Sequence, residues 1–297
     1  MKNYVTLLMV FWGCSLQSQI SGNQVYGNNS YETSKNYTKG STTQINENQL
    51  NVSVKILLNN KADYFTLVLG TNEEATTVQD CHATLNKRID SFTKDLAQMN
   101  IKKEAIYVDF ISQTKIYDYD ISGNNATEFL KGFEVKKNII ITSKNLTEIE
   151  NIITKASKYS IYDIIKVDYA NNDAMKIHLD LFEEAMKIAH EKKEQYIHAL
   201  KKKLVGTPNA QEEFSIFFPK TQYKKYQAYE SADVETYYRN RSQSQNFIQK
   251  IARKNTTFYY DGVPLSGFDK IIDVAKSEIG IQYVLNLTVT YKIDTSL

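Results

Sequence analysis

Between Asp63 and Tyr169 the chain repeats one order of hydrophobic patterns: alternating positions, a stripe at spacings of three and four, and alternating positions again. Alternation is typical of half-buried strands, and the wider spacing is typical of one apolar helix face. The stripe of the first unit consists of Val78, Cys81, Leu85, Ile89, Phe92, Leu96 and Met99. The pattern therefore predicts two consecutive strand-helix-strand repeats.

Local signals place the ends of these elements. Thr71 to Glu74 reads as a capping box that opens the first helix, and Asn145 with Glu148 caps the second. The polar run Tyr117 to Asn125 predicts a hairpin tip between the two units. The four strands can then share one sheet, with both helices on one face.

Three further elements flank the repeats. Val52 to Ile56 alternates as a strand, and a longer helix is expected from about Asp173 to Leu204. Positions Ile279 to Ile293 alternate without a break, which predicts a long, half-buried, antiparallel strand that completes a sheet begun far earlier in the chain. We therefore expect an α+β fold with an antiparallel or mixed sheet and helices packed on one face. It contains two βαβ-like repeats, a long helix and a long C-terminal strand, in one domain over residues 49–297.

The N-terminus resembles a bacterial export signal: Lys2 precedes the apolar run Val5 to Trp12, followed by Gly13, Cys14 and small polar residues. The apolar run is too short to span a bilayer, so we expect no transmembrane helix in the mature chain. Ordinary cleavage after about Ser18 would make residues 1–18 the signal peptide. Lipoprotein processing before Cys14 would leave a lipid anchor there. Residues 19–48 are rich in Asn, Ser, Thr and Gly and predict a flexible lead-in.

Charge and cysteine content limit the classes of partner and the covalent crosslinks that we expect. The 36 basic and 34 acidic residues give a net charge of +2, which provides no overall field for nucleic acid. After export Cys81 is the single cysteine in the body of the chain, so no internal disulfide can form. Its place in the helical stripe predicts a buried core thiol.

No catalytic, cofactor or metal site is predicted. The histidines are His82, His178, His190 and His198, and none has the helical spacing of paired metal ligands. No nucleophile-elbow motif or glycine-rich phosphate loop occurs. Paired acids are interpreted as solvated surface: Glu183-Glu184, Glu212-Glu213 and Asp118 with Asp120.

The segment Lys220 to Tyr260 has eight basic and three acidic residues interleaved with tyrosines. Such a composition is typical of a solvated surface, and it also suits contact with a glycan or a protein partner. Lys201 to Lys203 are interpreted as favourable charge at the C-terminal end of the long helix.

From about Asn51 to Ile293 the sequence resembles the SIMPL domain family, also called DUF541. The runs that carry the resemblance are Met99-Asn100-Ile101, Tyr117-Asp118-Tyr119, Gly132-Phe133-Glu134-Val135, Ile139 to Thr142, Asn145-Leu146 with Ile149 and Ile152-Ile153, Ala185 to Leu200, and Leu287 to Tyr291. Two departures stand out. The long helix is poorer in alanine than is usual in the family, and residues 206–278 show little similarity.

The resemblance implies an exported envelope protein without an established reaction. Members of this family are associated with stress tolerance, and some of them with ring-like oligomers. We therefore expect a noncatalytic protein of the periplasm or outer membrane of a Gram-negative bacterium. It would act through homo-oligomeric assembly or through an envelope protein or glycan partner. The alternative is an extracytoplasmic hydrolase or ligand-binding protein with a cleft in residues 206–278.

Overall fold

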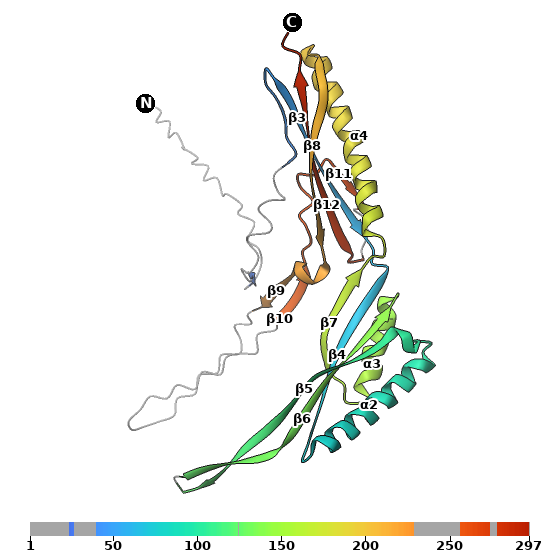
Figure 1. Cartoon of the computed structure of the whole chain (residues 1–297), viewed down its shortest axis with the longest axis vertical. Helices are drawn as coiled ribbons and strands as arrows, with labels where there is room; N and C mark the ends of the chain where they lie inside the picture. The colour runs from blue at the N-terminus through green and yellow to red at the C-terminus, as the bar shows by residue number, and fades with distance from the viewer. Residues whose placement is uncertain (1–23, 27–39, 124, 229–255, 274–277, 297) are drawn as a thin grey trace, which may run out of the picture. The chain divides into compact units, whose positions relative to one another are not determined.

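The computed structural model describes residues 24–26, 40–123, 125–228, 256–273 and 278–296, which belong to two units (Figure 1). The smaller unit contains a three-stranded sheet in the order β1-β9-β10. Its strands are β1 (Gln24–Tyr26), β9 (Tyr223–Ala228) and β10 (Thr256–Tyr260). β1 pairs antiparallel with β9. The expected signal peptide, residues 1–18, lies outside the described residues.

The larger unit contains two sheets. One is a four-stranded antiparallel sheet that holds both repeats, and we call it the helix-pair sheet. Its elements are β4 (Tyr64–Ala75), α2 (Val78–Gln98), the 3-10 turn η1 (Lys103–Ala105), β5 (Ile106–Ser122), β6 (Asn125–Ser143), α3 (Leu146–Ser157) and β7 (Asp163–Ala170). The strand order is β5-β6-β4-β7. Each helix thus connects two strands that have a third strand between them. α2 connects β4 to β5 with β6 between, and α3 connects β6 to β7 with β4 between. This is a split β-α-β arrangement, and it confirms the two expected repeats.

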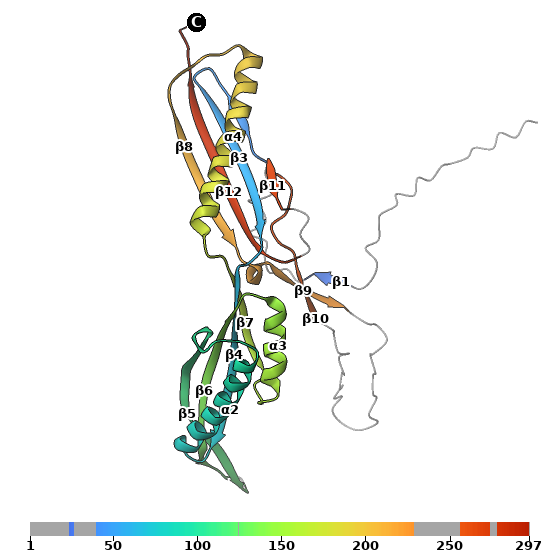
Figure 2. The ribbon, with the colours of Figure 1, turned by 90° about the vertical axis from the view of Figure 1, so that its right-hand side faces the viewer.

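Both helices pack on the same face of this sheet through their hydrophobic stripes (Figure 2). Leu85, Phe92 and Leu96 of α2 are fully buried, together with Leu67 of β4 and Ile139 of β6. Such a stripe needs a sheet face to cover it, because an isolated helix gains little stability from its own hydrogen bonds. The expected packing of helices on one face is therefore confirmed.

The start of α2 differs from the expectation. The capping box at Thr71–Glu74 is wrong, because β4 continues to Ala75 and its ladder with β6 carries the strand past that motif. The N-cap is Thr77, whose hydroxyl oxygen accepts a hydrogen bond from the Asp80 N–H at 3.1 Å. The second cap is confirmed, since the Asn145 side chain accepts from the Thr147 N–H at 2.9 Å.

The hairpin between β5 and β6 also differs. The turn lies within the predicted range Tyr117–Asn125 but is shorter, since Tyr117 to Ser122 continue β5 and the register pairs Ser122 with Asn125. The reason is visible in the sequence, where Tyr117, Tyr119 and Ile121 keep the two-residue period of a strand. The aspartates between them gave the run its polar composition.

The second sheet of the larger unit, which we call the α4 sheet, has the order β11-β3-β12-β8, with β2 also on β3. Its elements are β2 (Thr43–Ile45), β3 (Gln49–Asn60), α4 (Ala174–Leu200), β8 (Leu204–Phe217), the 3-10 turn η2 (Pro219–Gln222), β11 (Lys270–Ile272) and β12 (Ile281–Ile293). β12 lies antiparallel to β3, as expected for the long terminal strand. β11 is parallel to β3, so this sheet is mixed.

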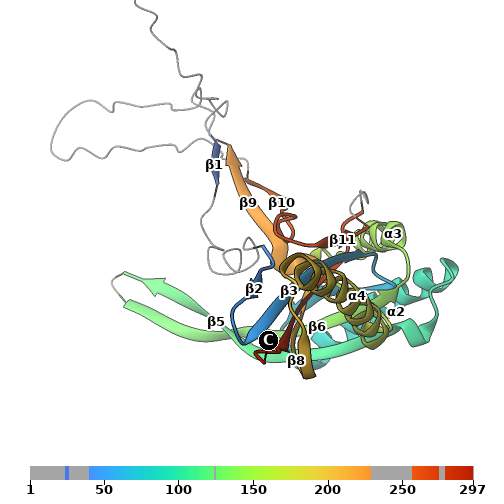
Figure 3. The same cartoon turned by 90° about the horizontal axis from the view of Figure 1, so that it is seen from above.

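The long helix packs along the α4 sheet (Figure 3), burying Leu181, Ala185 and Ala189 against β3 and β12. The opposite face of β3 and β12 has a smaller core around Leu57 and Val284, which contacts Val263 of the segment before β11. The flexible lead-in expected over 19–48 therefore ends earlier than expected, because Thr43–Ile45 already pairs with β3.

Gly132 provides a stability test of the repeats. A Cβ atom at this position would lie 2.5 Å from the backbone oxygen of Ala75, so the close approach of β6 to the end of β4 requires glycine. We expect Gly132→Ala to lower the free energy of unfolding by roughly 1–3 kcal/mol, measured by denaturant titration. Gly40→Ala is the matched control, since nothing lies within 4 Å of its Cβ position. Equal stability of the two variants would contradict the steric explanation.

Candidate functional site

Strands β5 and β6 continue past the rest of their sheet as a two-stranded ribbon. The last pair between β4 and β6 joins Ala75 to Phe133, so the residues of β6 before Phe133 pair only with β5. We call Ile116–Ser122 together with Asn125–Gly132 the arm, which Figure 1 shows as two green strands extending beyond β4. Among its described residues, no side chain from Tyr117 to Lys131 is buried.

The arm is unusually apolar for an exposed ribbon. Its large hydrophobic residues are between 42% and 79% exposed: Tyr117, Tyr119, Ile121, Phe129 and Leu130. Tyr117, Tyr119 and Ile121 alternate along β5, and Leu130 is opposite Tyr117, so these four share one face. A two-stranded ribbon is marginally stable alone, and clustered exposed apolar residues are typical of a contact surface.

The charged residues of the arm lie between these hydrophobic positions. Asp118 accepts a hydrogen bond from the Tyr119 N–H at 2.9 Å and forms an ion pair with Lys131 at 3.1 Å. The backbone hydrogen bond, followed by the lysine, lowers the pKa of Asp118 below its ordinary value. Asp118 is therefore a surface carboxylate with local partners, and Asp120 is exposed.

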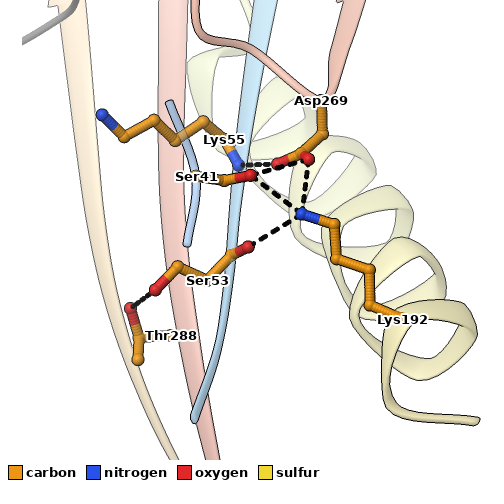
Figure 4. Close-up of polar contacts among 6 residues, drawn as sticks. All are labelled: Ser41, Ser53, Lys55, Lys192, Asp269 and Thr288. Carbon is orange, nitrogen blue, oxygen red and sulfur yellow. Dashed lines mark hydrogen bonds and ion pairs between the residues drawn. The ribbon is translucent and has the colours of Figure 1, made fainter. Parts of the chain in front are cut away.

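A second feature is a polar cluster at the edge of β3 (Figure 4). Lys192 of α4 donates to Asp269, to the Ser41 hydroxyl at 2.8 Å and to the Ser53 carbonyl at 3.1 Å. Asp269 also accepts from Ser41 at 2.7 Å and from the Lys55 N–H at 2.8 Å. The side chains of Lys192 and Asp269 are only 22% and 14% exposed.

The location of this cluster explains its role. Along its outer edge β3 pairs with β2 through Leu50 to Val52 and with β11 through Ile56 to Leu58. Between these two short strands the Lys55 N–H and the Ser53 carbonyl are bound by the side chains of Asp269 and Lys192. The cluster therefore completes the hydrogen bonding of β3 where its two edge strands leave a gap.

A serine beside a lysine also suggests nucleophilic catalysis, in which the amine removes the hydroxyl proton. The hydrogen bonds run the other way here. Lys192 donates to Ser41, and Ser41 directs its own proton to Asp269. The Ser41, Lys192 and Asp269 side chains thus form a closed donor-acceptor ring that supports the fold. Sequence analysis missed this cluster, because its members are far apart in the chain and form no motif.

Of the four histidines, His82 lies in α2, and the other three lie along α4. His82 lies 3.3 Å from the Gln113 side chain and stacks on Phe110, while His178 lies 2.9 Å from Glu212. His190 approaches Lys193, its neighbour on α4, at 3.1 Å. Across the described ranges, no three or more His, Cys, Asp or Glu side chains are grouped closely enough to hold a metal ion.

The paired acids form separate contacts. Glu184 forms an ion pair with Lys270 at 2.6 Å, and this hydrogen bond lowers the pKa of Glu184. Glu212 contacts His178, whereas Glu213 accepts from the Asn286 amide at 3.5 Å. These pairs thus connect α4, β8, β11 and β12 across the surface of the α4 sheet. Glu184, Glu212 and Glu213 each have a partner on a neighbouring element.

The basic, tyrosine-rich segment Lys220–Tyr260 is described only in part, because residues 229–255 lie outside the described residues. Tyr260 donates to the Gln282 side chain at 3.1 Å, and burial raises the pKa of Tyr260 to about 12. Tyr223 contacts the Tyr260 ring edge-on at 5.9 Å. Gln282 also accepts from the Val263 N–H at 2.6 Å, so this end of the segment has a packing role.

Cys81 is fully buried, and its thiol donates to the Phe133 carbonyl at 3.2 Å. The expectation of a core thiol is therefore confirmed. Within the described ranges, no helix combines the length and apolar character needed to cross a bilayer. The N-terminal residues with the export signal and Cys14 lie outside those ranges.

Comparison with known proteins gives one family. No curated protein matches the chain. The family model SIMPL, described as a protein of unknown function (DUF541), matches residues 50–252. This range includes the helix-pair sheet, α4 and the arm, and it extends into the segment from residue 206 that we expected to diverge. The terminal strand β12 lies beyond it. The chain belongs to the SIMPL (DUF541) family.

Proposed function

We propose that this SIMPL-family protein is a noncatalytic component of the cell envelope that acts by homo-oligomeric assembly or by binding an envelope partner. Its place would be the periplasm or the outer membrane of a Gram-negative bacterium, with a role in tolerance of envelope stress. The observation that carries the proposal is the arm. Its hydrophobic residues are exposed on a ribbon that no third strand joins within the described residues.

The free energy of burying the hydrophobic side chains of the arm in a complex would be substantial. Burial of apolar surface contributes about 25 cal/mol per Å² removed from water, so covering the five large side chains of the arm would stabilise a complex by several kcal/mol. The same contact would order a ribbon that is only marginally stable by itself. A binding role accounts for both the length of the arm and its exposed hydrophobic residues.

Export is supported by the order of charged, apolar and small polar residues at the N-terminus. Removal after about Ser18 would release the protein into the periplasm, whereas lipidation of Cys14 would attach it to a membrane. Mass spectrometry of the native N-terminus distinguishes the two, because a lipidated cysteine and a free Gln19 differ in mass and in sequence.

A noncatalytic role is supported by the local structural partners of the candidate polar groups. The Lys192, Asp269 and Ser41 group closes the edge of β3, and Glu184, Glu212 and Glu213 contact side chains on neighbouring elements. These side chains contribute to the fold, and none of them needs a substrate to explain its position.

Assembly is tested by light scattering coupled to size exclusion on residues 19–297. We expect a mass above that of one chain, decreasing on dilution. Tyr119→Asp places a charge in the contact, so we expect it to raise the dissociation constant at least tenfold, the loss of about 1.4 kcal/mol.

The matched control is Tyr162→Asp, since Tyr162 is 69% exposed and lies outside the arm. The control is expected to keep the mass of the unmodified protein. A wild-type chain that stays strictly monomeric across a wide concentration range would rule out assembly.

A further inference from the structure

The outer edge of β5 has no described strand beside it. β5 is 17 residues long and is the terminal strand of the helix-pair sheet, hydrogen-bonded to β6 alone. No side chain in β5 is buried. Its outward N–H and C=O groups therefore form a long row that can accept another strand.

The other long sheet edge of this chain has features that discourage such pairing. β8 contains Pro208, which has no N–H to donate, and Gly206 at a positive φ of 71°, and its register with β12 is interrupted between Thr290 and Lys292. β5 has no proline, and its sequence is rich in β-branched and aromatic residues. Two register shifts occur against β6, but Ser112 to Ile116 pair without interruption between them.

Exposed apolar side chains occur on both faces of β5. Those with at least 42% exposure are Tyr107, Phe110, Ile111, Tyr117, Tyr119 and Ile121. A strand added at the free edge would place its own side chains beside these residues on both faces, at the spacing of cross-strand pairs.

We infer that β5 pairs with β5 of a second copy of this chain, antiparallel about a twofold axis, to join two four-stranded sheets into one. This inference rests on the proposed assembly and specifies its interface. A twofold contact uses the same patch on both chains, so one free edge and one apolar row meet their own equivalents. The second copy satisfies the edge hydrogen bonds and covers part of the hydrophobic side chains of β5 in the same contact.

Charge favours a protein partner over a lipid surface. Asp118, Asp120 and Glu128 lie in the arm with Lys131, and Lys131 is paired with Asp118. Anionic bilayers attract clustered lysine and arginine, which this hairpin does not provide. With three acidic residues and one lysine, the arm would be repelled by an anionic bilayer.

The test is a scan of single cysteines along β5 in residues 19–297, oxidised mildly and analysed without reductant. The buried Cys81 stays in place, because its full burial keeps it from reacting between chains. Positions to substitute include Tyr107→Cys, Ser112→Cys, Thr114→Cys and Asp118→Cys. In a twofold antiparallel pair a residue faces its own equivalent only at the axis, where Cα atoms lie about 4.5–5.5 Å apart, within disulfide range.

We therefore expect covalent dimers at one position or at immediate neighbours, formed at least roughly tenfold faster than elsewhere on β5 because pairing raises the local thiol concentration. The matched control is Lys166→Cys on β7, the opposite edge of the same sheet, where we expect only slow collisional dimerisation. Crosslinking at every β5 position would indicate parallel, in-register contact and would overturn the twofold model.

Light scattering separates this inference from the proposed function. Oligomers that show no self-crosslinking along β5 would leave the assembly proposal in place and overturn the β5 interface. A chain that is monomeric before oxidation would overturn both assembly and the interface. Oligomers with crosslinking confined to one site on β5 would support both.

Discussion

Replacing Phe92 by alanine is expected to lower the free energy of unfolding by about 3–5 kcal/mol. Phe92 of α2 is fully buried in the core of the helix-pair sheet, and its ring contacts that of Tyr159 at 5.9 Å. The variant loses the transfer free energy of the ring and leaves a cavity between helix and sheet that neighbouring residues fill only in part. Denaturant titration followed by circular dichroism measures the loss.

A matched control is Phe258→Ala, because Phe258 is 65% exposed. That change is expected to alter stability by no more than about 0.5 kcal/mol. If both variants lost the same stability, the core packing of α2 would not be the cause.

Asp269→Ala is expected to lower the free energy of unfolding by about 2–4 kcal/mol. The change removes the acceptor for the Lys55 N–H, for the Ser41 hydroxyl and for the Lys192 ammonium group. The lysine would remain largely covered beside the Ser53 carbonyl without a counter-ion. Thermal and denaturant unfolding would measure the effect.

Two comparisons make this result specific. Glu278→Ala breaks an ion pair with Lys61 whose side chains are 38% and 57% exposed, and should cost no more than about 1 kcal/mol. The double variant Asp269→Ala with Lys192→Met should be little less stable than Asp269→Ala alone, since the two side chains act as a unit. Fully additive losses would contradict that coupling.

The sequence predicts the elements of this fold better than their limits. The stripes of α2 and α4 and the alternation of β12 are long, and long periodic runs average out local exceptions. Thr71 failed as a cap signal because a short motif competes with ladder pairing of β4. The hairpin tip predicted at Tyr117–Asn125 was too long, because the polar composition of this run concealed an alternation that its aromatic residues maintain.

The candidate site was less accessible from sequence for a physical reason. Ser41, Lys192 and Asp269 are brought together by strand pairing on β3, so no spacing along the chain shows their contact. The arm could have been found from the alternation of Tyr117, Tyr119 and Ile121, which continues beyond the last residue that the helices can cover. The exposure of these side chains follows only from the structure, in which the pairing of β4 with β6 ends at Ala75.

β12 is the last strand of the chain and occupies an inner position in the α4 sheet, between β3 and β8. That sheet therefore stays incomplete until the C-terminal residues are available, since β3 and β8 do not pair with each other. The helix-pair sheet uses one contiguous stretch from Tyr64 to Ala170 and can form earlier, with much shorter loops to close. During synthesis from the N-terminus, the helix-pair sheet would thus form before the α4 sheet. Insertion of β12 between β3 and β8 is the step that joins these two strands into one sheet.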